Sequence, residues 1–591
     1  MRESVRGLAW RHRLDATGIN IATAISQRHG LPDLLGRVLA ARGGTLDNVP
    51  TLLNPTLKEL MPDPSMLRDM DKAAERLARA IEQRERIAIF GDYDVDGASS
   101  SALLARFLAA HRCEARIYIP DRLLEGYGPN APAITRLIEE GASLIVTVDC
   151  GTTSFAPLAA AKGTRAEIVV VDHHQADERL PEVHAVVNPN RQDDLSGLGH
   201  LCAAGVVFLL LVATARVLRG KGHYSGDRSE PKLLEWLDIV ALATVCDVVP
   251  LEGLNRAYVT KGLQIMRSRR NVGLKALADA AGVKEPPNPY QLGFVLGPRI
   301  NAGGRVGDAG LGARLLSCDN PLEIGRIAVL LDKHNRERKA IEAAMLEAAL
   351  ADAEREIEAD PELPILIAGS PEWHKGLVGL VASRLTDRFQ RPSLVIAWAS
   401  PEEGTGSLRS IAGVDIGAAV REAAASGLLV KGGGHAMAAG LTVRAEKLEE
   451  LQAFLKDRLR QRVAAERVAA GLDIDGALTP RSATNDLIDL LEKAGPYGQG
   501  NPMPRFVFPA HRVRSARIMG ETHIRCLIEA GDGARLEAVA FRAVGSALGD
   551  LLLGNVNGLP LHFAGQLRRD TWGGRDRIEL TIEDVADPRR Q

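Results

Sequence analysis

Carboxylates and imidazoles suited to hydrolytic chemistry recur in four short segments of this 591-residue chain. In chain order they are Asp92, Asp94, Asp96, Asp149, Asp172, His173, His174 and Asp247. Carboxylates gathered in one place repel one another and take up protons, and divalent cations relieve that repulsion. Aspartate oxygens together with neutral imidazole suit Mn²⁺ or Mg²⁺. If the fold brings the four segments together, the sequence predicts a centre that holds such ions.

Two divalent ions about 3.5–4 Å apart can clamp a phosphodiester, ionise the attacking water and stabilise the leaving oxygen. Such a centre needs one carboxylate shared by both ions, and Asp149, central in the order of segments, is the candidate. We expect Asp94 to serve the first ion. We expect Asp96, His173 and Asp247 to serve the second. The prediction is a two-metal phosphodiesterase with Mn²⁺ or Mg²⁺ as its cofactor.

The other members of the set have different expected roles. Asp92 is placed among the catalytic residues, and Asp172 is expected to orient the histidines that follow it. His174 is expected to face the scissile phosphate and donate a hydrogen bond to the negative charge that develops on it. An aspartate after a strand is often only a helix N-cap, so any single one of these acids is more readily structural. Four sites, two of them multidentate, are hard to explain as caps alone.

The elements that must position these residues alternate along the chain. The predicted strands are 86–90, 115–120, 144–148 and 167–171, and the predicted helices are 71–86, 98–112 and 130–141. Three strands run directly into the acids, and an apolar helix at 233–245 leads into Asp247. The alternation is typical of a parallel sheet covered on both faces. Ligands bind such sheets beyond the carboxyl ends of the strands, where these acids stand.

The rest of the chain is organised differently. Gly- and Arg-rich residues 297–310 are interpreted as a loop, and strands at 363–369 and 392–398 with a helix at 378–389 indicate a second, smaller α/β domain. Short strands with Gly and Pro turns from residue 470 indicate a β-barrel. The expected domains are an N-terminal segment (1–70), a catalytic domain (71–329), a connecting helix (330–359), the smaller α/β domain (360–469) and the barrel (470–591).

Composition excludes several protein classes. Hydrophobic residues make up 46% and charged residues 25%, an ordinary globular balance, and the net charge of −2 does not decide for or against a nucleic-acid partner. No stretch reaches the roughly 18 uninterrupted apolar residues of a membrane helix, and the first residues lack an apolar export signal. The six cysteines form no CxxC pair, so we expect reduced thiols in the cytoplasm.

Taken together, the motifs resemble those of the DHH phosphoesterase superfamily and, more narrowly, the RecJ exonucleases. The matching segments, in this order between about residue 50 and the end, are GDYDVDG, PDRLLEGYG, TVDCGTTS, VDHH, ATVCDVV, GPRINAGGR, EWHKGLVGLVASRL, SLRSIAGVDI and KGGGHAMAAG. Three residues such as DHH recur by chance, whereas the ordered set is specific. The resemblance implies a parallel-sheet DHH domain, a long helix, a smaller α/β DHHA1 domain and an OB-fold barrel.

The same resemblance implies an activity. Members of the family hydrolyse single-stranded DNA from 5′ to 3′ into mononucleotides with Mn²⁺ or Mg²⁺, and they act in recombination and mismatch repair. Their usual partners are a helicase and a single-strand-binding protein. A monomer is expected because no repeated interface pattern is visible in the sequence.

Several residues in these motifs suit a phosphate ligand. Gly433 and Gly434, beside His435, let backbone amides approach a phosphate closely, although such a run is often just a tight turn. The hydroxyl of Ser407 and the guanidinium group of Arg409 suit a terminal phosphate. A pocket for the 5′-phosphate would explain 5′ polarity. Further substrate candidates are Arg122 and Arg305, for which surface salt bridges are the alternative, and His374, which could instead cap a helix.

The barrel is the expected single-strand-binding domain. Residues 501–591 hold 13 arginines, no lysine and 11 acids, so positive charge must be clustered on one face to matter. The aromatic candidates for base stacking are Phe506, Phe508, Phe541, Phe563 and Trp572. Most aromatics of a small barrel are core residues, so we expect only one or two of the five to be exposed.

Three other functions share parts of this pattern. A phosphodiesterase for dinucleotides or short oligonucleotides shares the metal site but lacks the barrel and the long N-terminal portion. A pyrophosphatase of the same superfamily needs no extended groove. A non-catalytic DNA-binding scaffold is expected to have lost metal ligands, whereas Asp94, Asp96, Asp149, His173 and Asp247 all remain.

Overall fold

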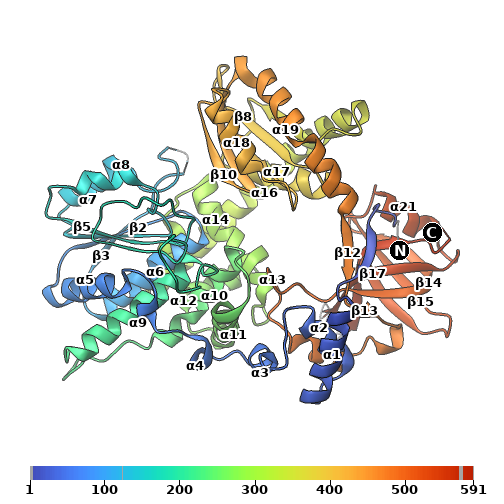
Figure 1. Cartoon of the computed structure of the whole chain (residues 1–591), viewed down its shortest axis with the longest axis horizontal. Coiled ribbons are helices and arrows are strands. Elements are labelled where there is room, and N and C mark those ends of the chain that lie inside the picture. The colour runs from blue at the N-terminus through green and yellow to red at the C-terminus, as the bar shows by residue number, and fades with distance from the viewer. Residues whose placement is uncertain (1–3, 123, 571–576, 590–591) are drawn as a thin grey trace. The chain divides into compact units, whose positions relative to one another are not determined.

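The computed structural model of the chain (Figure 1) describes residues 4–122, 124–570 and 577–589. Contacts between Cα atoms divide the chain into two compact units. One unit comprises residues 62–249 and 261–469 and contains all the acids and histidines singled out above. The other comprises residues 1–61, 250–260 and 470–591, so the two ends of the chain belong to the same unit.

A five-stranded parallel sheet carries the predicted acids. Its order is β3-β2-β4-β5-β6, with β2 (Ile87–Gly91), β3 (Ala115–Tyr118), β4 (Leu144–Val148), β5 (Glu167–Val171) and β6 (Ala185–Val187). The four strands predicted from the sequence are confirmed, whereas the three-residue β6 was not predicted. Strands β2 and β4 are buried at every position, as expected of central strands covered on both faces.

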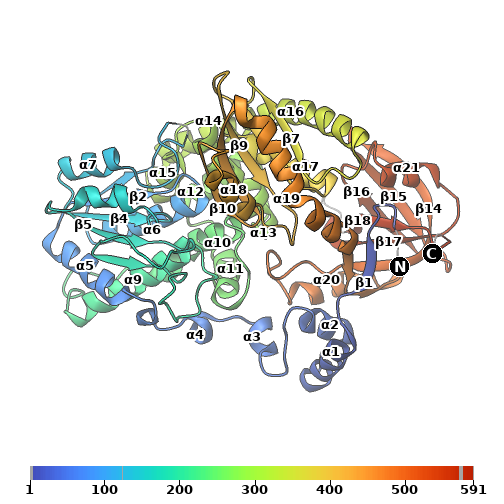
Figure 2. The same cartoon turned by 45° about the horizontal axis from the view of Figure 1, so that its top comes forward.

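Helices cover both faces of this sheet. They are α5 (Met70–Gln83), α6 (Val95–Ala110), α7 (Ala131–Glu139), α8 (Phe155–Leu158), α9 (Ala203–Gly220) and α10 (Leu237–Cys246). The pair α7 and α8 lies on one face, and α5, α6 and α9 lie on the other, as Figure 1 and the turned view in Figure 2 show. By length and composition α9 could cross a membrane, but 72% of it is buried within the protein, against α5 and α6.

Two expectations about the helices that follow are wrong. These helices are α11 (Gly253–Met266), α12 (Val272–Ala280), α13 (Pro289–Gln291), the π-helix η4 (Leu292–Leu296), α14 (Gly297–Val306), α15 (Leu311–Ser317) and α16 (Pro321–Ala359). The segment 297–310 is not a loop, since most of it is α14. The connecting helix begins at Pro321 and not at residue 330, because Asn320 caps it with Pro321 in its first turn.

A second sheet follows α16 and has the order β10-β11-β9-β8-β7. Its strands are β7 (Leu366–Ser370), β8 (Ser393–Trp398), β9 (Glu403–Arg409), β10 (Lys431–His435) and β11 (Ala438–Arg444), with helices α17 (Val378–Phe389), α18 (Ile416–Ala425) and α19 (Leu448–Ala469). Only β7 and β8 pair in parallel. The two strands and the helix predicted between residues 363 and 398 are confirmed.

The other unit is built on a closed barrel. Its strands are β14 (Phe506–Met519), β15 (His523–Glu529), β16 (Arg535–Ala540), β17 (Leu561–Asp570) and β18 (Arg577–Ala586), and pairing of β14 with β17 closes the ring. The predicted barrel is confirmed. Within the same unit, Ile25 of α1 (Ala16–His29) and Leu35 of α2 (Asp33–Ala40) belong to the barrel's hydrophobic core. Strand β1 (Ala9–His12) pairs with β12 (Gly471–Ile474).

Candidate active site

Asp94 and Asp96 lie where β2 turns into α6. Asp94 is the N-cap of α6, and its Oδ1 accepts hydrogen bonds from the backbone N–H groups of Asp96 (2.9 Å) and Gly97 (3.0 Å). The buried Asp96 accepts from the N–H groups of Ala203 (2.6 Å) and Ala204 (2.8 Å) at the start of α9. Both acids therefore cap helices, yet an ionised carboxylate has about four lone-pair sites and retains capacity for a cation.

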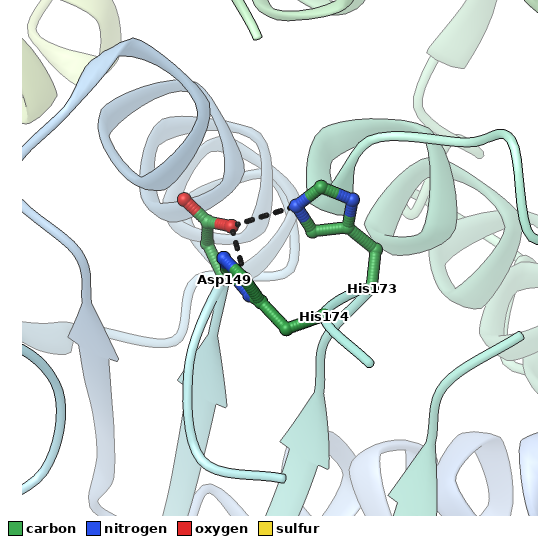
Figure 3. Close-up of side chains that lie close together, drawn as sticks. All are labelled: Asp149, His173 and His174. Carbon is green, nitrogen blue, oxygen red and sulfur yellow. Dashed lines mark ion pairs between the residues drawn. The ribbon is translucent and has the colours of Figure 1, made fainter. Parts of the chain in front are cut away.

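Asp149 follows β4 directly and adopts an unusual backbone conformation. Its φ is 61°, in the left-handed region that residues other than glycine seldom occupy. The backbone N–H donates to the carbonyl of Val171 at 3.0 Å, which ties the residue to the end of β5. Strain of this kind persists only where the surroundings enforce it, and it gathers at active sites. The side chain is buried and is aimed at both histidines of the DHH triplet, as Figure 3 shows.

Asp172 organises the turn after β5 through hydrogen bonds. Its Oδ1 accepts from the N–H of His173 (2.8 Å) and from Nδ1 of His174 (2.8 Å), and its Oδ2 accepts from the N–H of Thr152 (3.0 Å). Although burial opposes ionisation, these donors hold the pKa of Asp172 below its ordinary value. A carboxylate engaged in this way orients its neighbours, so the geometry supports the expected positioning role.

His173 is the point at which the four segments meet. Its Nε2 lies 3.4 Å from Oδ1 of Asp149, 3.6 Å from Oδ2 of Asp247 and 3.8 Å from Oδ2 of Asp96. Asp247 reaches this point from the C-cap of α10. The fold therefore brings together residues that are far apart in the sequence, as the strand-end pattern predicted.

Three overlapping sets of side chains could each hold a cation. They are Asp92, Asp94 and Asp149; Asp96, His173 and Asp247; and Asp149, His173 and His174, with the ligand atoms of each set within 4.8 Å of one another. Asp149 belongs to two sets, which supports its predicted place between two ions. Asp92 and His174 were not predicted as ligands, so their presence here widens the candidate ligand set.

The electrostatics of the cluster fit divalent cations. Burial, followed by the charges of neighbouring aspartates, raises the pKa of Asp92 and Asp149 well above the ordinary value, and it raises the pKa of Asp247 to about 9. One oxygen of each of these three residues is buried without a hydrogen-bond partner among the described residues. Buried carboxylate oxygens without donors need a counterion, and hard cations bind such oxygens.

Two asparagines that the sequence interpretation missed fix the DHH turn from behind. The buried Asn188 donates from Nδ2 to the carbonyl of His174 at 2.8 Å, and Asn190 donates to the carbonyl of His173 at 2.5 Å. Asn188 follows β6 directly, so the same strand-end rule would have found it had that short strand been predicted. A third missed residue is Tyr127, whose hydroxyl lies 3.2 Å from Nε2 of His174 and donates to the carbonyl of Asp149 at 3.3 Å.

The aspartates around His174 favour the protonated form of its ring. Burial disfavours its charge, but the hydrogen bond and the charge of Asp172 raise the pKa of His174 to about 9. Because Nδ1 is engaged by Asp172, Nε2 is the nitrogen left to donate to a ligand, and the hydroxyl of Tyr127 lies 3.2 Å from it. A charged imidazole in this position can donate to an anionic ligand at neutral pH.

The phosphate-binding candidates of the second sheet lie in adjacent rows across three strands. Ser407 of β9 is in register with Gly440 of β11, which is in register with Gly433 of β10. In the next row on the same side, Arg409, Ala438 and His435 are in register. Two motifs that are separated in the sequence thus meet at one end of the sheet. Arg409 also donates to the hydroxyl of Ser407 at 2.8 Å.

Gly433 and Gly434 leave backbone exposed beside this row. A Cβ at Gly433 would meet no atom within 4 Å, so the space beside it is open. Gly434 has a φ of 149°, and a Cβ there would lie 2.5 Å from the carbonyl oxygen of Ala438. A side chain is excluded at the second position, and a ligand can approach the first.

Arginines of both α/β domains lie close enough together for each to affect the others' charge. Burial, and then the charges of Arg122, Arg338 and Arg409, lower the pKa of Arg305 to about 9. Arg305 donates to the carbonyl of Gly376 at 2.9 Å, and Arg122 lies over the ring of Tyr93 at 4.9 Å. Over the described residues, Arg122, Arg305 and Arg409 have no ion pair, so the surface-salt-bridge alternative finds no support. Uncompensated guanidinium groups favour an anionic ligand.

His374 lies close to Arg305. A Cβ at Gly376 would lie 3.1 Å from the carbonyl oxygen of Arg305 and 3.1 Å from the ring of His374. His374 also accepts from the N–H of Gly376 at 3.1 Å, which is a turn-stabilising contact just before α17. The structure brings His374 to the arginine cluster while also giving it a local structural bond, so both expected roles stay open.

The aromatic candidates of the barrel separate by burial. Phe506, Phe508 and Phe563 are core residues with no exposed surface, and Trp572 lies outside the described residues. Phe541 is 41% exposed, with Arg568 4.7 Å above its ring and His523 5.2 Å from it. Among the described candidates, Phe541 is therefore the one that is available to stack on a base.

Protein-family models match the chain in three successive segments. Residues 86–244 match the DHH family, N-terminal domain; residues 362–461 match the DHHA1 domain; residues 474–584 match the RecJ OB domain. The parallel sheet, the second sheet and the closed barrel described above occupy these segments. The expected fold class is confirmed.

Individual relatives match over nearly the whole chain. The single-stranded-DNA-specific exonuclease RecJ of Salmonella typhimurium is 36% identical over 567 residues, which cover 94% of this chain and 96% of that protein. The crystal structure of RecJ from Thermus thermophilus in complex with Mn²⁺ matches with a TM-score of 0.77 at 29% identity, covering 98% of this chain and 80% of that one. The structure of the same protein in complex with Mg²⁺ matches with a TM-score of 0.73 at 28% identity, covering 100% of this chain and 79% of that one.

Proposed function

This chain belongs to the RecJ family of single-stranded-DNA-specific exonucleases, and on that premise we propose that it releases mononucleotides from the 5′ end of single-stranded DNA. It is a metal-dependent hydrolase of phosphodiester bonds that uses Mn²⁺ or Mg²⁺. The observation that carries the proposal is the meeting of Asp96, Asp149 and Asp247 around Nε2 of His173.

The ligands are divided between two cations as the overlapping sets suggest. Asp94 and Asp92 would hold the first ion, Asp96, His173 and Asp247 would hold the second, and Asp149 could serve either. When bound, the two ions supply the acidity that ionises the attacking water and the charge that stabilises the leaving oxygen. Asp149 is fixed for a shared role by its backbone bond to β5 and by its strained φ.

His174 and Asp172 act together on the phosphate. Asp172 holds Nδ1 of His174 and keeps the ring charged, and the opposite nitrogen donates to a non-bridging phosphate oxygen as negative charge develops. Tyr127 restrains the ring from the other side, and Asn188 fixes its backbone. The protein thereby holds the donor in place before the strand binds.

The 5′ polarity follows from a terminal phosphate held by the second sheet. Arg409 and Ser407 offer a guanidinium group and a hydroxyl, Gly433 offers open backbone, and Arg305 adds a partly buried positive charge. A strand end that carries a phosphate can occupy this position, whereas a 3′-hydroxyl end cannot satisfy the arginines. The first phosphodiester then lies at a fixed reach from the carboxylate cluster.

The biological setting is proposed from the family. We infer a role in DNA recombination and mismatch repair in the cytoplasm, with a helicase that supplies single strands and a single-strand-binding protein that keeps them open. The enzyme is proposed to act as a monomer, with Phe541 of the barrel stacking on a base of the single strand.

The test uses purified protein, Mn²⁺ or Mg²⁺ and four substrates: 5′-labelled and 3′-labelled single strands, a blunt duplex and a dinucleotide. We expect immediate release of labelled mononucleotide from the 5′-labelled strand and no cleavage of the duplex. Replacing a residue that only supports a metal ligand costs roughly 10- to 100-fold in activity. Asp149→Ala removes a proposed ligand itself, so it should lower the rate by more than that, while strand binding persists. Asp387→Ala, at an exposed position of α17, is the control and should retain the wild-type rate.

Other outcomes point to the remaining candidates. Activity confined to the dinucleotide would replace the proposal with a small-substrate phosphodiesterase. Tight binding of single strands without any cleavage in either metal would indicate a scaffold. Release of the 3′ label first would contradict the phosphate pocket while leaving the metal centre intact.

A further inference from the structure

Two aromatic rings lie stacked on the surface of the catalytic domain. The ring centroids of Tyr290 and Phe294 are 5.0 Å apart with an interplanar angle of 27°, and the residues are 66% and 69% exposed. Aromatic residues make up only 4% of the chain, and most of its phenylalanines are buried. Exposed large apolar groups side by side mark binding surfaces more often than scattered single residues do.

The pair stands on a helical segment that runs along the carboxylate cluster. Tyr290 belongs to α13 and Phe294 to the π-helix η4, which continues without a break into α14. The carbonyl of Leu292 accepts a hydrogen bond from the thiol of Cys246 at 3.3 Å, and Cys246 directly precedes Asp247. Short π-helical insertions occur frequently at functional sites, because the extra residue redirects side chains.

The other end of the same segment touches the catalytic loop. A Cβ at Gly304 would lie 3.1 Å from the backbone oxygen of Tyr93, the residue between Asp92 and Asp94. About ten residues of helix separate Gly304 from Phe294, which is about 15 Å at roughly 1.5 Å per residue. A stacked strand advances about 3.4 Å per nucleotide, so this rod matches the length of about four nucleotides.

The charge of the segment suits a polyanion. Residues 286–307 include Arg299 and Arg305 and no acid. Arg299 donates to the carbonyl of Val295 at 2.7 Å, and it shares Asp332 with the largely exposed Arg336. Two cations on one acid leave a net positive charge next to the aromatic pair, where a phosphate backbone can run.

We propose that Tyr290 and Phe294 form a stacking platform for a base of the substrate strand, a few nucleotides on the 3′ side of the bond that is cut. This inference rests on the proposed function, since it takes single-stranded DNA with its 5′ end at the second sheet as the ligand. The platform grips bases without reading their identity, because every base offers a π-face. It holds the remaining strand beside the site after each nucleotide leaves.

The test measures binding of 5′-phosphorylated 20-mers to the full-length protein in EDTA by fluorescence anisotropy. One strand is intact, and each of the others has a single abasic site at one of positions two to eight. The wild type should lose affinity for strands whose abasic site lies at one or two positions between about two and six. Phe294→Ala should weaken binding of the intact strand roughly 5- to 100-fold and abolish this position dependence.

Two further variants separate stacking from other contacts. Phe294→Trp should retain the position-dependent loss, whereas Phe294→Leu, which keeps apolar surface without a π-face, should behave as Phe294→Ala does. The matched control is Leu234→Ala, since Leu234 is a half-exposed apolar residue of another helical segment (Leu233–Trp236), and it should bind as the wild type does. Circular dichroism checks that each variant is folded.

The inference is overturned if the wild type shows no position dependence, or if Phe294→Ala keeps it. It is also overturned if Phe294→Leu binds as the wild type does, which would indicate an apolar contact such as a protein partner. Failure of the proposed function is seen separately, as absence of mononucleotide release by the wild type from the intact strand in Mn²⁺.

Discussion

Asp238 is a buried acid near the start of α10, away from the proposed ligands, and its ionisation sets part of the protein's pH-dependent stability. The residue is only 2% exposed, and its Oδ1 accepts a hydrogen bond from the N–H of Ile239 at 2.8 Å. Burial raises the pKa of Asp238 from 3.8 to about 6, against the weaker opposing effects of that bond and of the Arg106 charge. Above this pH the folded protein must hold a charge that its surroundings disfavour.

The sign and the size of the effect follow from proton linkage. Because the folded pKa lies above the unfolded one, protonation stabilises the fold below about pH 4, and that stabilisation is lost as pH rises through about 6. At about pH 8 the ionised carboxylate costs about 3 kcal/mol, from roughly 1.36 kcal/mol for each pKa unit. Asp238→Asn keeps the acceptor oxygen and removes the charge. It should therefore raise the free energy of unfolding by about 3 kcal/mol at about pH 8 and by about half as much at about pH 5.

Urea unfolding at the two pH values measures this difference, with the fluorescence of the neighbouring Trp236 as the reporter. Glu235→Gln is the matched control, because Glu235 is half-exposed and its ion pairs with Lys232 and Arg270 are at the surface. Surface pairs contribute little, so the control should change stability by less than about 1 kcal/mol at either pH. A gain in Asp238→Asn that is equal at both pH values, or a loss at the higher one, would refute the burial argument.

Two further predictions concern ligands. Mn²⁺ at about 100 times its Kd should stabilise the protein by about 2.7 kcal/mol, which differential scanning fluorimetry would detect as a higher Tm. Asp247→Ala should lose most of that Tm shift. If the shift is undiminished in this variant, the ions bind elsewhere. Arg409→Lys should lower the ratio of kcat/KM for a 5′-phosphate strand to kcat/KM for a 5′-hydroxyl strand by roughly tenfold, because lysine cannot form the bidentate contact. An unchanged ratio would show that Arg409 does not bind the terminal phosphate.

The catalytic core could be predicted because strand ends converge by geometry. Parallel strands end at the same edge of a sheet, so acids placed directly after β2, β4 and β5 had to meet whatever the intervening helices did. Asp247 arrives from a helix, and only the apolar run before it indicated its position. The missed residues came from the short β6 and from a tyrosine in a loop, where no periodic pattern exists to be recognised.

The error at residues 297–310 has a physical cause. Glycine has a low intrinsic helix propensity, so a run with several glycines predicts a loop. The glycines of α14 instead permit close packing: a Cβ at Gly297 would lie 2.4 Å from the sulfur of Cys246, and one at Gly303 would lie 2.8 Å from the carbonyl oxygen of Asp308. Tertiary contact outweighs propensity there, and the sequence alone cannot reveal which neighbours a glycine will meet.

The distinction between a helix cap and a metal ligand, which the sequence left open, turns out not to be a choice between exclusive roles. Asp94 and Asp96 accept backbone hydrogen bonds at the starts of α6 and α9, and both remain in sets that could hold a cation. Asp172 lies on the other side of the division, because four backbone and imidazole donors engage it, whereas Asp94 and Asp96 accept two hydrogen bonds each. What separates the two kinds of acid is the number of donors on each carboxylate, since an ionised carboxylate has about four lone-pair sites and those left without a donor can bind a cation. Capping then fixes the direction of a ligand before the ion arrives, so the helix starts contribute to the rigidity that a two-ion site requires.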